Sequence, residues 1–250
     1  MKKCFIALNQ LHTPMKKKSF FLCCLSIICL PLVYGQTNKI AGAWRLQDGD
    51  IQHTLVMVDG YLAYSTFDIK NKKFINTWGG PYTEETQQLQ VNIQFNAQDP
   101  QDVQKKHIFN IKAQEELTTD ISGESTNWKR IDDNDGPLVG VWRITARKID
   151  GQLNDMPLRD RRTLKILSGT RFQWVAINIK TGEFSGTGGG FYTFTNNEYT
   201  ENIEFFSRDN TRVGASLTFD GKIENNQWHH SGLSSKGEPI DEIWGRLTEE

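Results

Sequence analysis

The chain has 250 residues, of which 37% are hydrophobic and 24% charged, and its formal net charge is −1. These values are ordinary for a globular protein, and the near-zero charge argues against a nucleic acid or an anionic membrane surface as a partner, because either would need a clustered basic surface. One short basic cluster, Arg159, Arg161 and Arg162, is interrupted by Asp160. We interpret it as a solvated loop.

Residues 1–35 differ in character from the rest of the chain. Met15 is followed by three lysines and then by a mostly apolar run from Phe20 to Val33, which ends shortly before Gly35. A positive start, a short apolar run and a small residue before the cut are the parts of a secretory signal peptide. We predict that residues 1–35 are such a peptide, with Met15 as an alternative start. The mature protein is then exported to the periplasm or the medium, without stable membrane insertion after cleavage.

The cysteines all lie in this predicted leader, at positions 4, 23, 24 and 29. The mature chain therefore has no disulfide, no thiol nucleophile and no cysteine metal ligand, and its core must stabilise it unaided. None of the four follows the small residue that a lipid-anchored cysteine requires, so we expect no lipid anchor.

The rest of the sequence is a tandem duplication. The opening segment Ile40–Leu46 matches Leu138–Ile144. Three further segments match at a constant separation of 110 residues: 68–74 with 178–184, 77–83 with 187–193, and 89–95 with 199–205. Such recurrence in one order indicates two copies of one module. We place them at residues 36–132 and 138–250, joined by a short turn-rich linker.

Both modules have the pattern of antiparallel strands. Leu89, Val91, Ile93 and Phe95 alternate with polar residues, which is the period of a strand with one buried face. The second module has strand-like segments at 163–167, 171–179, 191–194 and 212–219, separated by tight glycine and Asn/Asp turns. We predict an all-β, up-and-down meander in each module. Closure into a barrel would remove its edges, and a sandwich is the alternative.

The ends of the modules resemble the lipocalin and calycin pattern. Each opens with Gly-x-Trp and closes with Trp-x-Arg: Gly42-x-Trp44 and Trp128-x-Arg130, then Gly140-x-Trp142 and Trp244-x-Arg246. The second module is also similar to lipocalin-like domains of uncharacterised exported bacterial proteins, through Arg171–Trp174, Gly186–Gly190 and Tyr199–Glu201. The resemblance implies two tandem small up-and-down barrels. In each, Trp44 or Trp142 plugs the closed end, and Arg130 or Arg246 stacks on that indole. Each module is shorter than an ordinary lipocalin and lacks its helix.

Glu201 is the main candidate for a site. It corresponds to Val91 at the separation of 110 residues, and Val91 lies on the apolar face of its strand. Glu201 should therefore face the interior of the second barrel, together with Tyr199, Ile203 and Phe205. A buried carboxylate needs a partner or a proton. Candidate partners are Arg171, Gln173, Tyr192, His229 and His230; the alternative is that Glu201 is solvated at the rim or forms a structural ion pair.

Three other segments of the second module lead to further predictions. Phe172 and Trp174 pair with bulky residues of the first module, but the sequence leaves open which face of their strand is inward. If Trp228 points inward, strand parity makes His230 inward and His229 outward. Adjacent histidines are a poor chelate, so we predict no metal and no cofactor; the alternative is zinc with Glu201 as a co-ligand. Gly188–Gly190 lacks the lysine and the helix of a phosphate loop, and we predict a bend or bulge there.

We therefore predict an exported, non-enzymatic binding protein that holds a small apolar or amphipathic molecule, mainly in the second barrel. Its predicted ligand-binding residues are Glu201, Trp174, Phe172, Arg171, Tyr192, Tyr199 and His230. One alternative is a barrel isomerase or hydrolase in which Glu201 and a histidine lie within hydrogen-bond reach, about 3 Å apart. Another is a structural module that contacts a cell-surface protein. No standard catalytic motif is present, and no catalytic residue is assigned.

Overall fold

Strands joined by tight turns occupy nearly all of residues 39–247, the part of the chain that the computed structural model describes. Within this part, helical structure is limited to two single 3-10 turns, Pro100–Asp102 and Asn210–Arg212. None of the helical segments described has the length and apolar character needed to cross a membrane. The predicted signal peptide lies outside the described residues and stays a prediction.

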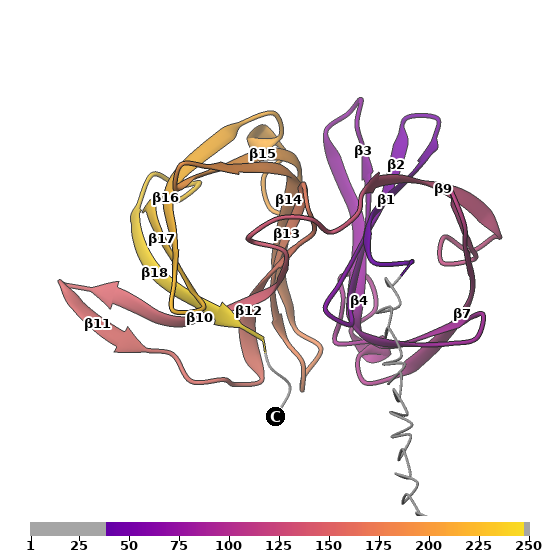
Figure 1. The fold of residues 1–250 in the computed structure, drawn as a ribbon, viewed down its shortest axis with the longest axis horizontal. Coiled ribbons are helices and arrows are strands. Elements are labelled where there is room, and N and C mark those ends of the chain that lie inside the picture. The colour runs from indigo at the N-terminus through magenta and orange to yellow at the C-terminus, as the bar shows by residue number, and fades with distance from the viewer. Residues whose placement is uncertain (1–38, 248–250) are drawn as a thin grey trace, which may run out of the picture. The chain divides into compact units, whose positions relative to one another are not determined.

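The first module folds into a closed antiparallel barrel (Figure 1). Each strand pairs with the next along the chain, and the last returns to the first. The short β6 continues the path of β5 beside β4, so eight strand positions complete the ring. The strands are β1 (Gly42–Asp48), β2 (Ile51–Val58), β3 (Tyr61–Asp68), β4 (Lys73–Glu85), β5 (Gln88–Asn92), β6 (Phe95–Asn96), β7 (Lys106–Ala113), β8 (Leu117–Thr119) and β9 (Thr126–Asp132).

The second module repeats this ring of eight strands, with β10 paired to β18 at the point of closure (Figure 1). One further strand, β11, pairs only with the far end of β10 and stands outside the ring. The strands are β10 (Gly140–Ile149), β11 (Gln152–Asp155), β12 (Arg161–Leu167), β13 (Arg171–Asn178), β14 (Phe184–Thr195), β15 (Glu198–Phe206), β16 (Ser216–Glu224), β17 (Gln227–Leu233) and β18 (Pro239–Arg246). The predicted pair of up-and-down barrels is confirmed, and the sandwich is not what forms.

Alternate residues of each strand fill the barrel interiors. In β15, Tyr199 and Glu201 are buried inside the ring. Phe205 is buried instead against Phe67 of the first barrel, with ring centroids 4.9 Å apart, so the prediction that it faces the interior was wrong. The largest interior side chains are indoles, contributed by Trp44 and Trp128 in the first barrel and by Trp142, Trp228 and Trp244 in the second. An eight-stranded ring is just wide enough for side chains to fill it or to leave room for one small ligand.

An arginine covers the tryptophan at one end of each barrel. The guanidinium carbon lies 3.9 Å from the indole centroid for both Arg130 over Trp44 and Arg246 over Trp142. Each indole N–H also donates a 2.8 Å hydrogen bond to the carbonyl four residues earlier. At Gly140, φ is +140° and an added Cβ would collide with the Arg246 guanidinium, so the glycine of this motif makes room for the arginine.

The Gly188–Gly190 run allows two strands to approach closely. Pairing of β14 with β15 shifts register between Gly189 and Gly190, which confirms the predicted bulge. A Cβ at Gly190 would lie 1.9 Å from the carbonyl oxygen of Asn202, and Gly80 has the same 1.9 Å approach to Asn92 in the first barrel. The glycines thus serve barrel geometry.

The outer faces of the two barrels pack against each other. Val56 and Ala63 of the first barrel belong to the same apolar cluster as Leu164 and Val175 of the second. Beside this cluster lies Gln173, which is 2% exposed. Its amide accepts a 2.9 Å hydrogen bond from Ser65 and donates to Thr77 and Thr187 at 2.8 and 3.1 Å. Gln173 therefore belongs to the inter-barrel contact, and the expectation that it pairs with Glu201 was wrong.

Asp132, the last residue of β9, ties the first barrel to the β12–β13 turn of the second. Its carboxylate accepts hydrogen bonds from the Ser168 hydroxyl at 2.8 Å and from the Thr170 hydroxyl and amide at 2.7 and 2.9 Å. Burial acts to raise the pKa of this carboxyl, but the hydrogen bonds from Thr170 and Ser168 outweigh it and hold the pKa below its usual value.

We predict that Asp132→Asn lowers the free energy of unfolding by about 1–3 kcal/mol at pH 7, because the amide loses hydrogen bonds to a charged acceptor. A lowered folded-state pKa contributes stability above the unfolded value, about 3.9, and this contribution is lost as the pH falls through the folded-state value. Urea unfolding at a series of pH values should therefore show the parent and the variant converging in acid. Asp133→Asn, whose side chain is 80% exposed, is the control and should change stability by less than about 1 kcal/mol. A pH-independent difference would contradict the assignment.

Candidate functional site

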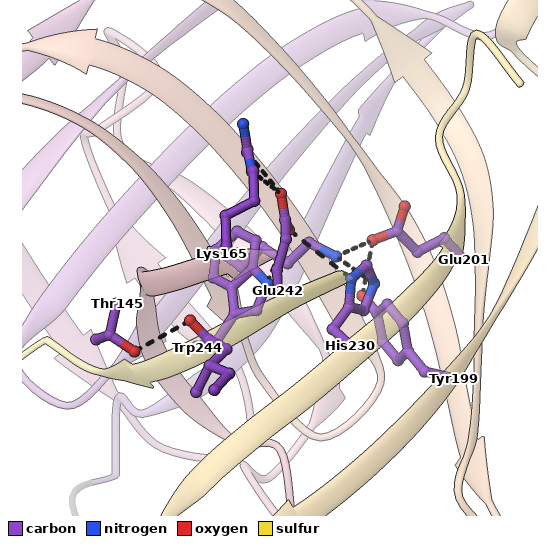
Figure 2. Close-up of polar contacts among 9 residues, drawn as sticks. Thr145, Lys165, Tyr199, Glu201, His230, Glu242 and Trp244 are labelled. Carbon is purple, nitrogen blue, oxygen red and sulfur yellow. Dashed lines mark hydrogen bonds and ion pairs between the residues drawn. The ribbon is translucent and has the colours of Figure 1, made fainter. Parts of the chain in front are cut away.

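Four strands of the second barrel bring charged side chains together inside the ring. Lys165 on β12, Glu201 on β15, His230 on β17 and Glu242 on β18 are all buried, with exposed fractions between 2% and 6% (Figure 2). They occupy inward positions of their strands, where parity would ordinarily place apolar residues. Because unpaired buried charge is expensive, each of these groups needs a partner within the ring.

Lys165 and Glu201 form the central ion pair. The Lys165 ammonium donates to Glu201 Oε1 at 2.8 Å, and the Tyr199 hydroxyl donates to the same oxygen at 3.0 Å (Figure 2). Burial, and then the adjacent Glu201 carboxylate, raises the pKa of Tyr199 well above its usual value. Tyr199 therefore acts as a neutral donor that supports the carboxylate.

Aromatic rings surround the Lys165 ammonium on its remaining sides. Nζ lies 4.8 Å from the Tyr199 ring centroid, 5.0 Å from Trp228, 5.3 Å from Trp244 and 5.5 Å from Phe219. Ring faces within about 6 Å attract a cation through their quadrupoles, and the effect is larger where water is excluded. The aromatic residues thus offset part of the desolvation of this ammonium.

His230 is a neutral neighbour of the ion pair. Its Nε2 lies 3.3 Å from Lys165 Nζ, and burial, followed by the Lys165 charge, lowers the pKa of His230 well below 6.5. Since the ammonium can only donate, Nε2 must accept and the ring proton resides on Nδ1. Nδ1 is buried, makes no hydrogen bond within residues 39–247, and lies 3.9 Å from Glu242 Oε2.

Glu242 is held on the other side of the cluster. Arg147 donates to Glu242 Oε1 from Nε at 3.1 Å and from Nη2 at 2.6 Å, while the Trp244 indole donates to Oε2 at 3.0 Å (Figure 2). Two cations, Lys165 and Arg147, therefore balance the two carboxylates, Glu201 and Glu242. The formal charges of these four side chains therefore sum to zero.

A small cavity opens over this cluster. Its volume is about 190 Å³, and charged groups and aromatic rings share its lining. Trp174, Phe206, Leu217 and Ile240 provide apolar wall, and Ser234 and Ser235 lie on the loop that follows β17. Glu201 lines the cavity, and its Oε2 makes no hydrogen bond within the described part of the chain. That oxygen is the acceptor best placed to meet a ligand.

The first barrel lacks the charged groups at the matching positions. Strand pairing places Leu55 where the second barrel has Lys165, and Val91 where it has Glu201. In the same way, Thr119 occupies the position equivalent to His230, and Thr126 the position equivalent to Glu242. The fold therefore forms without an internal ion cluster, and the cluster is particular to the second barrel.

The structure brings together some of the predicted site residues and separates others. Glu201, Tyr199 and His230 meet in the cluster, and Trp174 lines the cavity above it. Phe172 and Tyr192 lie in the interior core but do not line the cavity.

Arg171 is not part of the cavity lining. It occupies the outward face of β13 and pairs with Glu204 instead of Glu201. The face of β13 that the sequence left open is settled by Phe172 and Trp174, which point inward.

The sequence analysis did not identify Lys165, Arg147 and Glu242 as site residues. Lys165 carried the same signal as Glu201, because Lys165 stands 110 residues after Leu55. Arg147 and Glu242 had no such signal. Within residues 39–247, no group of three or more His, Cys, Asp or Glu side chains is arranged to hold a metal ion.

We predict that the first barrel's residues can replace the ion pair together but not singly. Glu201→Val leaves Lys165 buried and unpaired and should lower the free energy of unfolding by about 3–5 kcal/mol, whereas Lys165→Leu/Glu201→Val should be roughly neutral. Urea unfolding of the singles and the double in a mutant cycle measures this coupling. The exposed pair Lys222–Glu224 is the control, with an expected coupling below about 1 kcal/mol. Additive single effects would show that Lys165 and Glu201 are not coupled.

We also predict the protonation state of His230. The ¹⁵N–¹H correlations of its ring should show the Nδ1–H tautomer, with no protonation as the pH falls to 6.5. The unfolded chain takes up that proton first, so His230 should reduce stability as the pH falls below about 6.5. Lys165→Met should raise the pKa of His230 because one cause of its lowering is removed, while Lys222→Met should leave that pKa unchanged. An Nε2–H tautomer would contradict the donor assignment.

Comparison with known proteins gives similarity to solved structures only. No family model matches the chain, and no curated protein matches it. Among solved structures, a lipocalin-like protein from Bacteroides uniformis ATCC 8492 is similar, with a TM-score of 0.32 and 14% sequence identity over 45% of this chain and 100% of that one. The architecture is established by the strand order and the closure of each sheet. The described part of the chain is a tandem pair of closed, antiparallel, eight-stranded barrels.

Proposed function

We propose that this is a binding protein that holds a small amphipathic molecule in the mouth of its second barrel. The observation that carries the proposal is a charged cluster at the base of a cavity in one of two otherwise similar barrels. The first barrel has apolar or hydroxyl side chains at the same positions, so folding does not require the cluster.

The energetics of buried charge support this view. A buried ion pair is weak support for stability, because desolvation of both groups offsets their attraction. An alternative role for such a pair is to hold a polar group ready for a ligand. Glu201 fits that role, since Lys165 and Tyr199 share its Oε1 and leave Oε2 without a hydrogen bond in the described part of the chain. His230 Nδ1, in the same cluster, also makes no hydrogen bond in the described part of the chain, but it is fully buried.

The cavity limits the size of the ligand. Typical sites for drug-sized molecules have volumes of about 300–1,000 Å³. A cavity of about 190 Å³ suits a smaller molecule, or one end of a longer one. The apolar body would lie along Trp174 and Leu217, with a hydrogen-bond donor directed at Glu201 Oε2.

The arrangement favours binding over acid–base catalysis. An enzyme that used Glu201 with a histidine would need a direct hydrogen bond between them, or one through a single water. Lys165 lies between the two instead, 2.8 Å from Glu201 and 3.3 Å from His230. It donates a hydrogen bond to the carboxylate and favours the neutral imidazole, which suits recognition better than proton transfer. Binding would take place outside the cytoplasm if the leader acts as a signal peptide.

Two measurements test the proposal. The first is extraction of the purified protein in organic solvent, followed by mass spectrometry for a small molecule present at about one per chain. The second is titration with N-phenyl-1-naphthylamine, a neutral fluorescent probe that has an apolar body and one N–H donor. We expect its fluorescence to rise and to saturate at one site.

A pair of neighbouring substitutions locates that site. Leu217→Trp fills the cavity and should weaken probe binding at least about tenfold, which corresponds to 1.4 kcal/mol. Thr218→Trp adds the same bulk on the exposed face of β16 and should leave binding unchanged. Equal affinity of both variants for the probe, together with protein that carries no small molecule, would overturn the proposal.

A further inference from the structure

An insertion opens the wall of the second barrel beside its mouth. In the first barrel, β1 and β2 form a tight hairpin that stays paired to Asp48–Ile51. In the second, pairing of β10 with β12 stops at Arg143–Leu164, and β10 then pairs with β11. The opening motifs of the two modules are 98 residues apart (140 − 42), whereas Leu55 and Lys165 are 110 apart, so 12 extra residues lie between β10 and β12.

The split between β10 and β12 forms a groove of about 520 Å³ that is lined by five arginines. They come from β10, from the loop after β11 and from the start of β12: Arg143, Arg147, Arg159, Arg161 and Arg162. The groove shares Ile144, Arg147 and Thr163 with the cavity above the charged cluster. Arg159, Arg161 and Arg162, which we interpreted from the sequence as part of a solvated loop, are at least partly exposed. In the structure they line the same groove as Arg143 and Arg147.

The charge of this groove is only partly neutralised. Against the five arginines stand Asp155, Asp160 and Glu242, which leaves a formal excess of two positive charges (5 − 3). Glu242 is already committed to Arg147. The remaining arginines form no ion pair within residues 39–247.

Two of the arginines are fixed by backbone carbonyls instead of carboxylates. Arg143 donates to the Met156 carbonyl at 2.9 Å, and Arg162 donates to the Arg159 carbonyl at 3.0 Å. These bonds hold the loop and orient the guanidinium groups while leaving their charge available. Burial lowers the pKa of Arg162, whereas Tyr61 and Asp160 act to raise it and the nearby Arg143 charge makes the smallest contribution.

We propose that this groove binds the anionic group of the ligand, a carboxylate, sulfate or phosphate, and that the ligand is therefore an amphipathic organic anion. Guanidinium groups match the planar geometry of such oxyanions and bind them through paired hydrogen bonds. The identity of the ligand rests on the function proposed above. The apolar part of the molecule would extend from the groove, past the residues that line both hollows, into the cavity at the mouth of the barrel. The anion site itself stands on the groove alone.

The test compares two probes of equal chain length, decanoate and decan-1-ol, by isothermal titration calorimetry at constant ionic strength. We expect decanoate to bind at least about tenfold more tightly, a difference of 1.4 kcal/mol. Arg159→Gln/Arg161→Gln should remove most of that preference without disturbing the fold, because both side chains are exposed and unpaired in the described part of the chain. Lys112→Gln/Lys129→Gln removes the same charge from exposed sites on the first barrel and should keep the preference.

Inorganic phosphate provides an arm that does not depend on the proposed function. Its titration should shift the Nε–H signals of Arg143 and Arg162, and the arginine double variant should abolish the shift. If decan-1-ol binds as well as decanoate and phosphate shifts neither signal, the anion site is overturned and the binding function stands. If neither decyl probe binds while phosphate shifts both signals, the groove is an anion site and the proposed binding function fails.

Discussion

Each barrel depends on the hydrogen-bonded return of its last strand to its first. This closure pairs the edges of the sheet, except where β10 and β12 separate in the second barrel, and it forces every second residue into an interior of fixed width. Most of those residues are aromatic or aliphatic. A polar residue that points inward cannot reach bulk water, so it must find its partners on other strands of the same ring. The arrangement around Lys165 is a product of that restriction: Glu201 of β15 and His230 of β17 are its polar partners, and aromatic rings complete its surroundings.

Duplication provides an internal reference for what the fold requires. In both copies the guanidinium carbon lies 3.9 Å from the centroid of the indole that it covers, which marks this pair as part of the architecture. The ion cluster and the split wall occur only in the second copy, next to each other, and they change the chemistry of one barrel mouth. Features that two copies share describe how the module folds, and features that differ show where one copy has been adapted. For this reason we assign function to Glu201 and to the inserted segment, and a structural role to the tryptophan–arginine pair at the closed end of each barrel.

Much of the fold and part of the site could be predicted from the sequence. Strand periodicity and the repeat were sufficient for two up-and-down barrels, and the match of Glu201 to Val91 was sufficient to point a carboxylate inward. The partner of Glu201 could not be found in this way, because Lys165 and Glu201 come from strands that are not neighbours and meet only across the closed ring. Gln173 failed for a related reason: strand parity gives two faces, but only the packing of one barrel on the other makes the outer face of β13 a buried one.

That inter-barrel contact has a consequence for the protein as a whole. The apolar outer faces of β12 and β13, and the amide of Gln173 with its hydroxyl partners, are shielded only because the companion barrel is present. A solitary module would expose this surface to solvent and to self-association. Each barrel therefore shields the outer face of the other, and removal of the first barrel would expose the apolar surface of β12 and β13.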